Sequence, residues 1–226
     1  ERLGRCPLSF FFRYGLKIEP PEDYEADPSL WLDSLQSGSL LHELFYSFVH
    51  ELAQRNAKPE DTPEQRARLA ALLDETVRRY VRRYPPASTG AFQRRWRELE
   101  RTAAVFLTEE AEHCRRSTPV HLEWSIGMRE ETGEDAPRPG RLRLPDGCSL
   151  NVRGRIDRVD REPDGAFVIW DYKTGGPGRY SLSDPFHQGR VMQPALYVEL
   201  ASGALRALYG ETAEATAFGF FFPGPR

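Results

Sequence analysis

The chain has 226 residues, a formal net charge of −3 and 39% hydrophobic residues. Its length suits one globular domain or two small ones, and its nearly balanced charge does not by itself indicate a nucleic-acid binder. No apolar run is long enough to cross a bilayer, which argues against a membrane protein. Three scattered cysteines form no disulfide framework and favour a reducing, cytoplasmic location.

The N-terminal half is predicted to be helical. Apolar residues recur every three or four positions in Ser37–Glu51, the rhythm of a helix with one buried face, and Ser37 or Ser39 is available as N-cap. A second helix is expected at about Pro63–Tyr84 and a third at about Ser88–Cys114. The aromatic start of the chain and its strand-like end both indicate a piece of a longer protein.

Beyond these helices the pattern changes to that of strands. The segments with alternating or β-branched and aromatic residues are Val120–Gly127, Ser149–Asp160 and Ala166–Thr174. Pro-Asp-Gly turn signals stand at 145–147 and 163–165. A helix at about Asp184–Ser202 and a strand at Thr216–Phe222 follow. This order predicts an α/β domain with a helical insertion near its N-terminus.

Two aspartates lie inside the most strand-like part of the chain. If residues 163–165 form a three-residue hairpin loop, 162 pairs with 166 and paired numbers sum to 328. Asp157 then faces Asp171, with Cβ atoms roughly 5 Å apart. Lys173 returns to the same face. The opposite face is expected to hold Ile156, Val168 and Trp170.

Two acids and a lysine on one face indicate a site more strongly than a single strand aspartate would, because like charges so close repel each other. A divalent cation between them reverses that repulsion. Carboxylate oxygens suit Mg²⁺ or Mn²⁺, which leave positions open for water and phosphate oxygens. Lys173 could orient that water or stabilise charge on the phosphate. The chemistry indicated is phosphodiester hydrolysis.

The residues around this hairpin carry a family resemblance. GRIDRVD at 154–160, followed by WDYKTG at 170–175, resembles motifs II and III of the PD-(D/E)XK nuclease superfamily, in its RecB/AddB-like exonuclease branch. Three further segments match in the expected order: CPLSFFFRY at 6–14, GSLLHE at 38–43 and QPALY at 193–197.

The resemblance implies a fold and a set of roles. The fold is a restriction-endonuclease-like αβββαβ core with a mixed sheet and an N-terminal helical insertion. A single domain would span 1–226, with the helical part at about 28–118 and the catalytic core at about 119–226. The implied metal ligands are His42, Asp157, Asp171 and the backbone carbonyl of Tyr172. The implied catalytic group is Lys173, Asp157, Asp171, Gln193 and Tyr197. Glu123 matches a frequent acidic position of the branch.

The function that the resemblance implies is a Mg²⁺- or Mn²⁺-dependent DNA nuclease, an exonuclease in DNA repair or recombination. DNA is then the partner, and a helicase domain or subunit is a further candidate. Two alternatives stay open. One is a catalytically silent nuclease-fold module that binds DNA or serves assembly, and the other is a nuclease of the CRISPR-adaptation type.

Two further features have both a plain and a functional interpretation. Residues 66–101 contain ten arginines against four acids. The stripe Arg78, Arg79, Arg82 and Arg83 is either a solvated helix face or a candidate DNA contact. Cys6 is either a buried apolar residue or a ligand of a [4Fe–4S] cluster, as in some relatives of the family. Such a cluster is expected only in a longer protein, because its other cysteines would follow the last strand.

Overall fold

The structure is a computed structural model that describes residues 6–18, 27, 29–127, 140–143, 146–176, 184, 186 and 191–224. A short helix α2 (Pro7–Phe10) continues into a π-helix, η1 (Phe11–Gly15). The long helices of the N-terminal half are α3 (Ser34–Gln54), α4 (Pro63–Arg83) and α5 (Thr89–His113). All three long helices agree with the sequence prediction to within three residues at each end.

The start of α3 differs from the prediction. Asp33, and neither Ser37 nor Ser39, is the N-cap: its side chain accepts a hydrogen bond from the backbone N–H of Gln36 at 2.7 Å. The Gln36 side chain in turn accepts from the Asp33 N–H at 3.1 Å. This reciprocal capping box satisfies two backbone donors, whereas a serine cap further along would satisfy one. The helix therefore begins earlier than the serines indicate.

The C-terminal half forms a mixed sheet with one crossover helix. Its elements are β1 (Thr118–Ile126), β2 (Gly140–Arg143), β3 (Ser149–Val152), β4 (Gly154–Arg161), β5 (Phe167–Tyr172), α6 (Gln193–Tyr209) and β6 (Ala215–Phe221). The main sheet has the order β1-β4-β5-β6, antiparallel except for the parallel pair β5–β6. Strands β2 and β3 form a separate ribbon. The predicted α/β fold with a mixed sheet is confirmed.

Two predicted boundaries change. The segment predicted as one strand at 149–160 is divided between β3 and β4, which belong to different sheets. Helix α6 begins at Gln193, and most of the preceding predicted stretch lies outside the described residues, as does Pro145 of the first turn signal. Pro194 stands in the first turn of α6, where its missing N–H leaves no hydrogen bond unmade.

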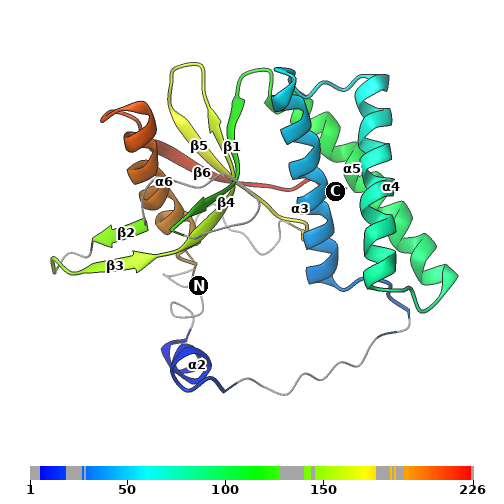
Figure 1. Ribbon diagram of the computed structural model, residues 1–226, viewed down its shortest axis with the longest axis horizontal. Helices are drawn as coiled ribbons and strands as arrows, with labels where there is room; N and C mark the ends of the chain where they lie inside the picture. Colours follow the sequence, from blue (N-terminus) through cyan, green and yellow to red (C-terminus); the bar gives the residue numbers. More distant parts are fainter. Residues whose placement is uncertain are drawn as a thin grey trace.

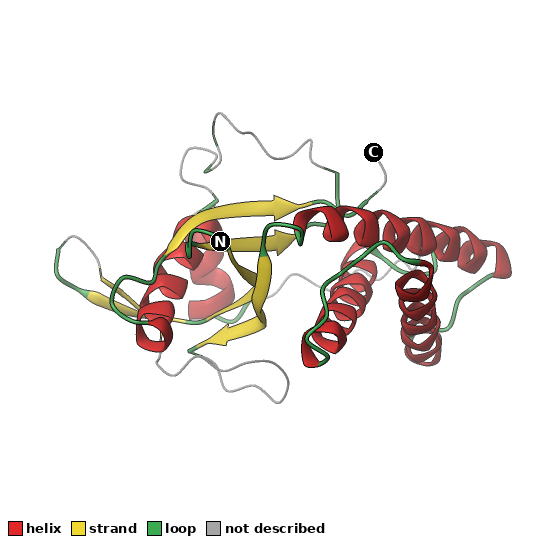
Figure 2. Ribbon diagram, turned by 90° about the horizontal axis from the view of Figure 1, so that it is seen from above, coloured by secondary structure: helices red, strands yellow, loops and turns green. Residues whose placement is uncertain are grey.

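The sheet lies between two helical layers, α6 on one side and α3, α4 and α5 on the other (Figure 1; Figure 2 shows the same layers from above). Each layer has its own core. Buried leucines and phenylalanines of α3, α4 and α5 meet Leu122 and Tyr172 of the sheet. Ile156, Val159 and Ile169 pack with apolar residues of α6. The part of the sheet that faces α3 therefore lies between these two cores.

The predicted hairpin register is confirmed. Arg158 pairs with Trp170 and Arg161 with Phe167, so that paired numbers sum to 328. The loop closes with a hydrogen bond from the N–H of Glu162 to the carbonyl of Ala166 at 2.8 Å. Gly165 has a φ of +88°, the left-handed conformation that the turn requires. The paired residues of β4 and β5 end at Arg158 and Trp170, so the facing of Asp157 and Asp171 one step beyond them stays a prediction.

One expectation about the sheet faces is wrong. Ile156 packs in the core on the α6 side, whereas Trp170 contacts the ring of His113 on α5. On a regular strand, residues two positions apart share a face. In β1, however, Leu122 packs on the α3 side and Trp124 on the α6 side, and the neighbouring β4 changes face next to them. Residue Glu123 between them has a φ of +47°. This interrupts the alternation that a regular strand would keep.

A pair of glycine substitutions tests this packing. A Cβ on Gly219 of β6 would lie 2.3 Å from Cζ3 of Trp170, so Gly219→Ala is expected to lower the free energy of unfolding by about 1–3 kcal/mol. Gly203 of α6 has no atom near its added Cβ. Gly203→Ala should therefore raise stability by about 0.5–1 kcal/mol, because alanine favours the helix. Urea unfolding of both variants measures the contrast, and equal stabilities would contradict it.

Candidate active site

A cleft of about 520 Å³ opens where the N-terminal half of α3 meets the ends of β4 and β5. Gly38 of α3 leaves room at its edge, since a Cβ there would lie 3.4 Å from Oγ1 of Thr174. The chemically functional side chains that line the cleft are His42, Glu43, Glu123, Arg155, Asp157 and Lys173. Five residues singled out from the sequence therefore meet in one cleft: His42, Glu123, Asp157, Tyr172 and Lys173.

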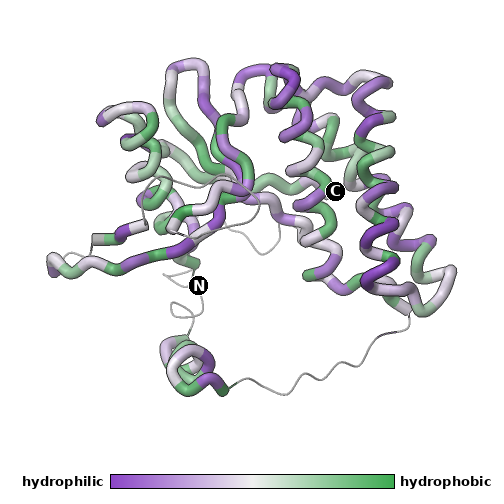
Figure 3. Tube along the Cα trace, in the orientation of Figure 1, coloured by the Kyte–Doolittle hydropathy of each residue, from purple (hydrophilic) through white to green (hydrophobic). Residues whose placement is uncertain are grey.

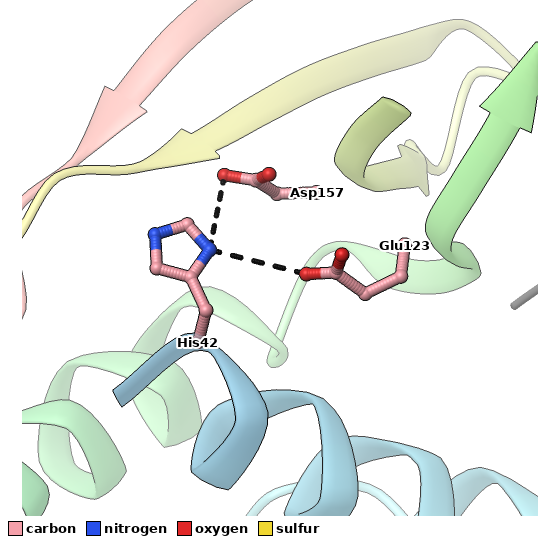
Figure 4. Close-up of side chains that lie close together, drawn as sticks. All are labelled: His42, Glu123 and Asp157. Carbon is pink, nitrogen blue, oxygen red and sulfur yellow. Dashed lines mark ion pairs between the residues drawn. The ribbon is translucent and has the colours of Figure 1, made fainter. Parts of the chain in front are cut away.

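His42 extends from α3 toward two carboxylates of the sheet (Figure 4). Its Nδ1 lies 3.6 Å from Oδ2 of Asp157 and 3.9 Å from Oε1 of Glu123. One ligand atom from each of these three side chains lies within 4.8 Å of the other two. An imidazole and two carboxylates so placed could hold a metal ion between them.

Tyr172 contacts both His42 and Asp157 through its backbone. Its carbonyl oxygen lies 3.0 Å from Nε2 of His42, and its N–H donates to Oδ2 of Asp157 at 2.9 Å. Its ring is buried against Phe45 and Phe106 of the helical core. The backbone of Tyr172, between Asp171 and Lys173, is thus held in place by its own side chain, which packs in the helical core.

Glu123 carried the least weight in the sequence prediction. Its left-handed backbone lies where β1 changes face, and its carboxylate points into the cleft. Oε2 forms an ion pair with Nε of Arg155 at 2.9 Å, and Oε1 is the oxygen that faces His42. The acidic residue in VHLEW at 120–124 was the available signal, but strand alternation alone does not predict toward which face its side chain points.

Asp171 lies beside this group and is bound by other partners. It is 2% exposed, and its Oδ1 accepts a hydrogen bond from Nε2 of Gln193 at 2.8 Å. Its Oδ2 forms an ion pair with Nζ of Lys173. The backbone N–H of Lys173 donates to the carbonyl of Phe221 at 2.8 Å, which fixes the lysine to β6.

Gln193 and Tyr197 lie one turn apart on α6. Tyr197 packs on the start of β4, where a Cβ on Gly154 would lie 3.2 Å from its Cε1. Burial raises the pKa of Tyr197 to about 12, so its hydroxyl stays neutral, and it hydrogen-bonds the side chain of Gln193. Gln193 and Tyr197 thus connect α6 to Asp171, and neither of them is among the residues that line the cleft.

The cleft has more negative charge than its own cations balance. Burial raises the pKa of Asp157 to about 6; His42 lowers it, and Asp171 raises it further. Burial also raises the pKa of Asp171, which Lys173 partly lowers. Burial alone would lower the pKa of His42, yet Glu123 and Asp157 raise it overall. A divalent cation would relieve this repulsion, so the donor set fits a hard metal ion.

The four arginines of α4 do not form one open cationic stripe. Arg78 forms an ion pair with Asp74, and Arg79 pairs with Glu43 of α3 at 2.8 Å. Arg82 is exposed, and Arg83 lies over the ring of Tyr84. Two of the four charges therefore have carboxylate partners within the protein.

The three cysteines differ in their exposure. Cys6, Cys114 and Cys148 are free thiols, and Cys114 alone of them is buried. The interpretation of Cys6 as a buried apolar residue is therefore wrong, while the iron–sulfur hypothesis for it stays a prediction.

Within the described residues, no helix combines the length and apolarity needed to cross a membrane.

The sequence profile of the PD-(D/E)XK nuclease superfamily matches residues 1–225. The chain belongs to the PD-(D/E)XK nuclease superfamily. The resemblance carried by the hairpin motifs is thereby confirmed, and the mixed sheet with its helical N-terminal part is consistent with the fold of that superfamily.

The relatives of this chain include bacterial proteins named as a subunit of an ATP-dependent helicase/deoxyribonuclease. The Clostridium perfringens protein is 26% identical over 208 residues, and the Acetivibrio thermocellus protein is 28% identical over 208 residues. Each match covers 88% of this chain and 17% of the relative. The Moorella thermoacetica protein is 26% identical over 229 residues, or 98% of this chain and 19% of the relative. The chain spans less than a fifth of these relatives.

Proposed function

We propose that this chain is a Mg²⁺- or Mn²⁺-dependent deoxyribonuclease domain that hydrolyses phosphodiester bonds. The observation that carries the proposal is the convergence of His42, Glu123 and Asp157 on one point, beside the ion pair of Asp171 and Lys173. The superfamily match and the deoxyribonuclease names of the relatives support the same reaction class.

The residues divide into ligands and positioning groups. His42, Asp157, Asp171 and the Tyr172 carbonyl would hold the metal, and Glu123 joins them because its carboxylate faces the same imidazole. When bound, the metal would polarise a phosphoryl oxygen and lower the pKa of a bound water. Gln193 holds one oxygen of Asp171, leaving the direction of that carboxylate fixed.

Lys173 is the group proposed to act on the reacting phosphate. Its ammonium borders the cleft, beside Asp171, and its backbone is fixed to β6. A positive charge held in this place would stabilise negative charge that develops on the phosphate, without reorganisation at the moment of reaction. Arg155 adds a second cation on the cleft wall.

The names of the relatives extend the proposal to a biological setting. We propose an exonuclease domain that acts on DNA together with a helicase domain or subunit in DNA repair, in the cytoplasm. The alternative of a catalytically silent module is disfavoured by the side chains themselves, because His42, Glu123, Asp157 and Lys173 line one cleft and Asp171 pairs with that lysine. No observation favours a CRISPR-adaptation nuclease over the helicase-associated type.

An assay on linear and closed circular DNA tests the proposal. The wild-type chain is expected to degrade linear DNA with Mg²⁺ or Mn²⁺ and to be inactive in EDTA, while circular DNA persists if cleavage starts from ends. Asp157→Asn removes a proposed ligand and should lower the rate by about 100-fold or more. Calorimetric titration with Mn²⁺ should show weaker binding by the same variant.

Asp164→Asn is the matched control, because it makes the same chemical change in the exposed hairpin loop. It should retain both the rate and the Mn²⁺ affinity of the wild type. Wild-type protein that binds Mn²⁺ and DNA without cutting either form of DNA would instead support the silent module.

A further inference from the structure

A second cleft, of about 640 Å³, lies between α4 and α5 and shares no lining residue with the catalytic cleft. Both helices lie on the side of the molecule opposite α6 (Figure 1). We call this cleft the α4–α5 groove. Its apolar floor consists of Val77, Val81, Phe92 and Trp96. Its polar rim consists of Asp74, Arg78, Arg82, Gln93 and Arg97.

The floor presents two aromatic rings, one helical turn apart. The centroids of Phe92 and Trp96 are 6.1 Å apart and their planes differ by 28°, so the rings are stacked with an offset. Both side chains are half-buried, unlike core aromatics such as Phe106. Flat, partly exposed rings of this kind are what nucleobases stack on.

The rim adds positive charge that the protein does not neutralise. The charge of Arg78 is balanced by its ion pair with Asp74. Arg82 and Arg97 are exposed and make no ion pair with any described residue. Figure 3 shows that hydrophilic positions are frequent along α4. Two cations beside two aromatic rings match the phosphate and base of a nucleotide.

The groove is connected to the catalytic cleft through α4. Arg79 lies next to Arg78 in the helix, and it reaches Glu43, which lines the catalytic cleft. Arginines of α4 therefore extend from the edge of that cleft to the rim of the groove. A negatively charged strand that leaves the cleft past α4 would pass the paired Arg79 and Arg78 and reach the exposed charges of Arg82 and Arg97.

We propose that the α4–α5 groove binds single-stranded DNA outside the catalytic cleft, with bases on Phe92 and Trp96 and phosphates on Arg82 and Arg97. This inference rests on the proposed function for the identity of the nucleic acid. A volume of this size lies in the range of small-molecule pockets and admits a nucleotide, whereas duplex DNA keeps its bases stacked inside and offers no free ring face.

Fluorescence anisotropy with a labelled oligothymidine of roughly 16 nucleotides tests the proposal, in EDTA so that no cleavage occurs. The double variant Arg82→Glu, Arg97→Glu is expected to bind at least about tenfold more weakly. It should also lower the slope of log affinity against log salt by about 1.4, for two lost phosphate contacts. Trp96→Ala should weaken binding by about 5- to 100-fold, and Trp96→Phe should restore most of the affinity.

The matched control is the double variant Arg115→Glu, Arg116→Glu. It makes the same change of charge at two exposed residues after the far end of α5, and it should bind like the wild type. The proposal is overturned if the groove variant keeps wild-type affinity and salt slope, or if the control weakens binding equally. In the first case a docking surface for another protein segment would explain the apolar floor.

The two proposals fail in different ways. Groove-dependent oligothymidine binding without cleavage under any divalent cation would keep the groove and overturn the nuclease proposal. Metal-dependent cleavage with oligothymidine binding that ignores the groove variants would do the reverse.

Discussion

Replacing Lys173 by alanine should lower kcat for DNA cleavage by about 100- to 1,000-fold, the loss typical of removing one preorganised charge from a reaction site. The lysine borders the cleft and pairs with Asp171, and its backbone is fixed by Phe221. DNA affinity in EDTA should stay near that of the wild type, because one of many phosphate contacts is lost. Single-turnover cleavage in Mn²⁺ measures the effect on the chemical step.

A comparison with Asp171→Asn separates the two partners of this ion pair. Asp171→Asn should weaken Mn²⁺ binding and abolish turnover, whereas Lys173→Ala should keep Mn²⁺ binding and lose only turnover. Lys58→Ala makes the same lysine-to-alanine change outside the cleft, where the side chain donates to the carbonyl of Cys114. It should cleave like the wild type. Cleavage by Lys173→Ala at the wild-type rate would refute the role given to this residue.

The hairpin was predictable from the sequence because its turn determines its register. Pro-Asp-Gly supplies a fixed φ, a side chain that bonds its own loop, and a glycine for the left-handed position. All three features are found, including the hydrogen bond from the N–H of Ala166 to Asp164 at 3.0 Å. The turn therefore predicted the pairs from Arg161–Phe167 to Arg158–Trp170. Strict strand alternation beyond them, on which the predicted facing of Asp157 and Asp171 rests, does not hold throughout β4.

Glu123 and Ile156 were less predictable because both lie where that alternation fails. The left-handed backbone of Glu123 shifts the faces of β1 and β4, and no local sequence signal requires it in a non-glycine residue. The start of α3 shows a milder limit: Asp33 and Gln36 cap the helix together, while two serines offered competing caps. Local sequence rules discriminate poorly between neighbouring residues when tertiary packing determines strand faces and helix starts.

The buried charges between α5 and the sheet could not be read from the sequence. The side chain of Arg158 is 1% exposed and pairs with Glu110 of α5 and Asp160 of β4. It also donates to the hydroxyl of Tyr172 at 3.0 Å. The contact between Arg158 and Glu110 was not predictable, because no local pattern specifies a contact between residues 48 positions apart.

Arg158→Met is expected to lower the free energy of unfolding by about 3–5 kcal/mol, because the buried Glu110 loses its counter-charge and the buried Asp160 keeps its contact with His113 but loses that with Arg158. Adding Glu110→Gln should recover part of the loss, since one orphaned charge is removed. The matched control, Arg115→Met, breaks only an exposed pair with Glu112 and should change stability by less than about 0.5 kcal/mol. Urea unfolding at neutral pH measures all three variants.

The same substitution should also change how stability depends on pH. Burial alone would raise the pKa of Asp160, but Arg158 and His113 lower it overall. In the wild type this carboxylate therefore stabilises the fold above its unfolded pKa of about 3.9, and the contribution is lost as the pH falls through the lower folded pKa. Without Arg158 the pKa of Asp160 is lowered by His113 but no longer by the arginine, so the folded pKa rises relative to the wild type and acidification relieves the penalty. The stability difference between wild type and Arg158→Met should therefore shrink as the pH falls toward 4; a difference that stays constant would show that lost packing, and not unpaired charge, is responsible.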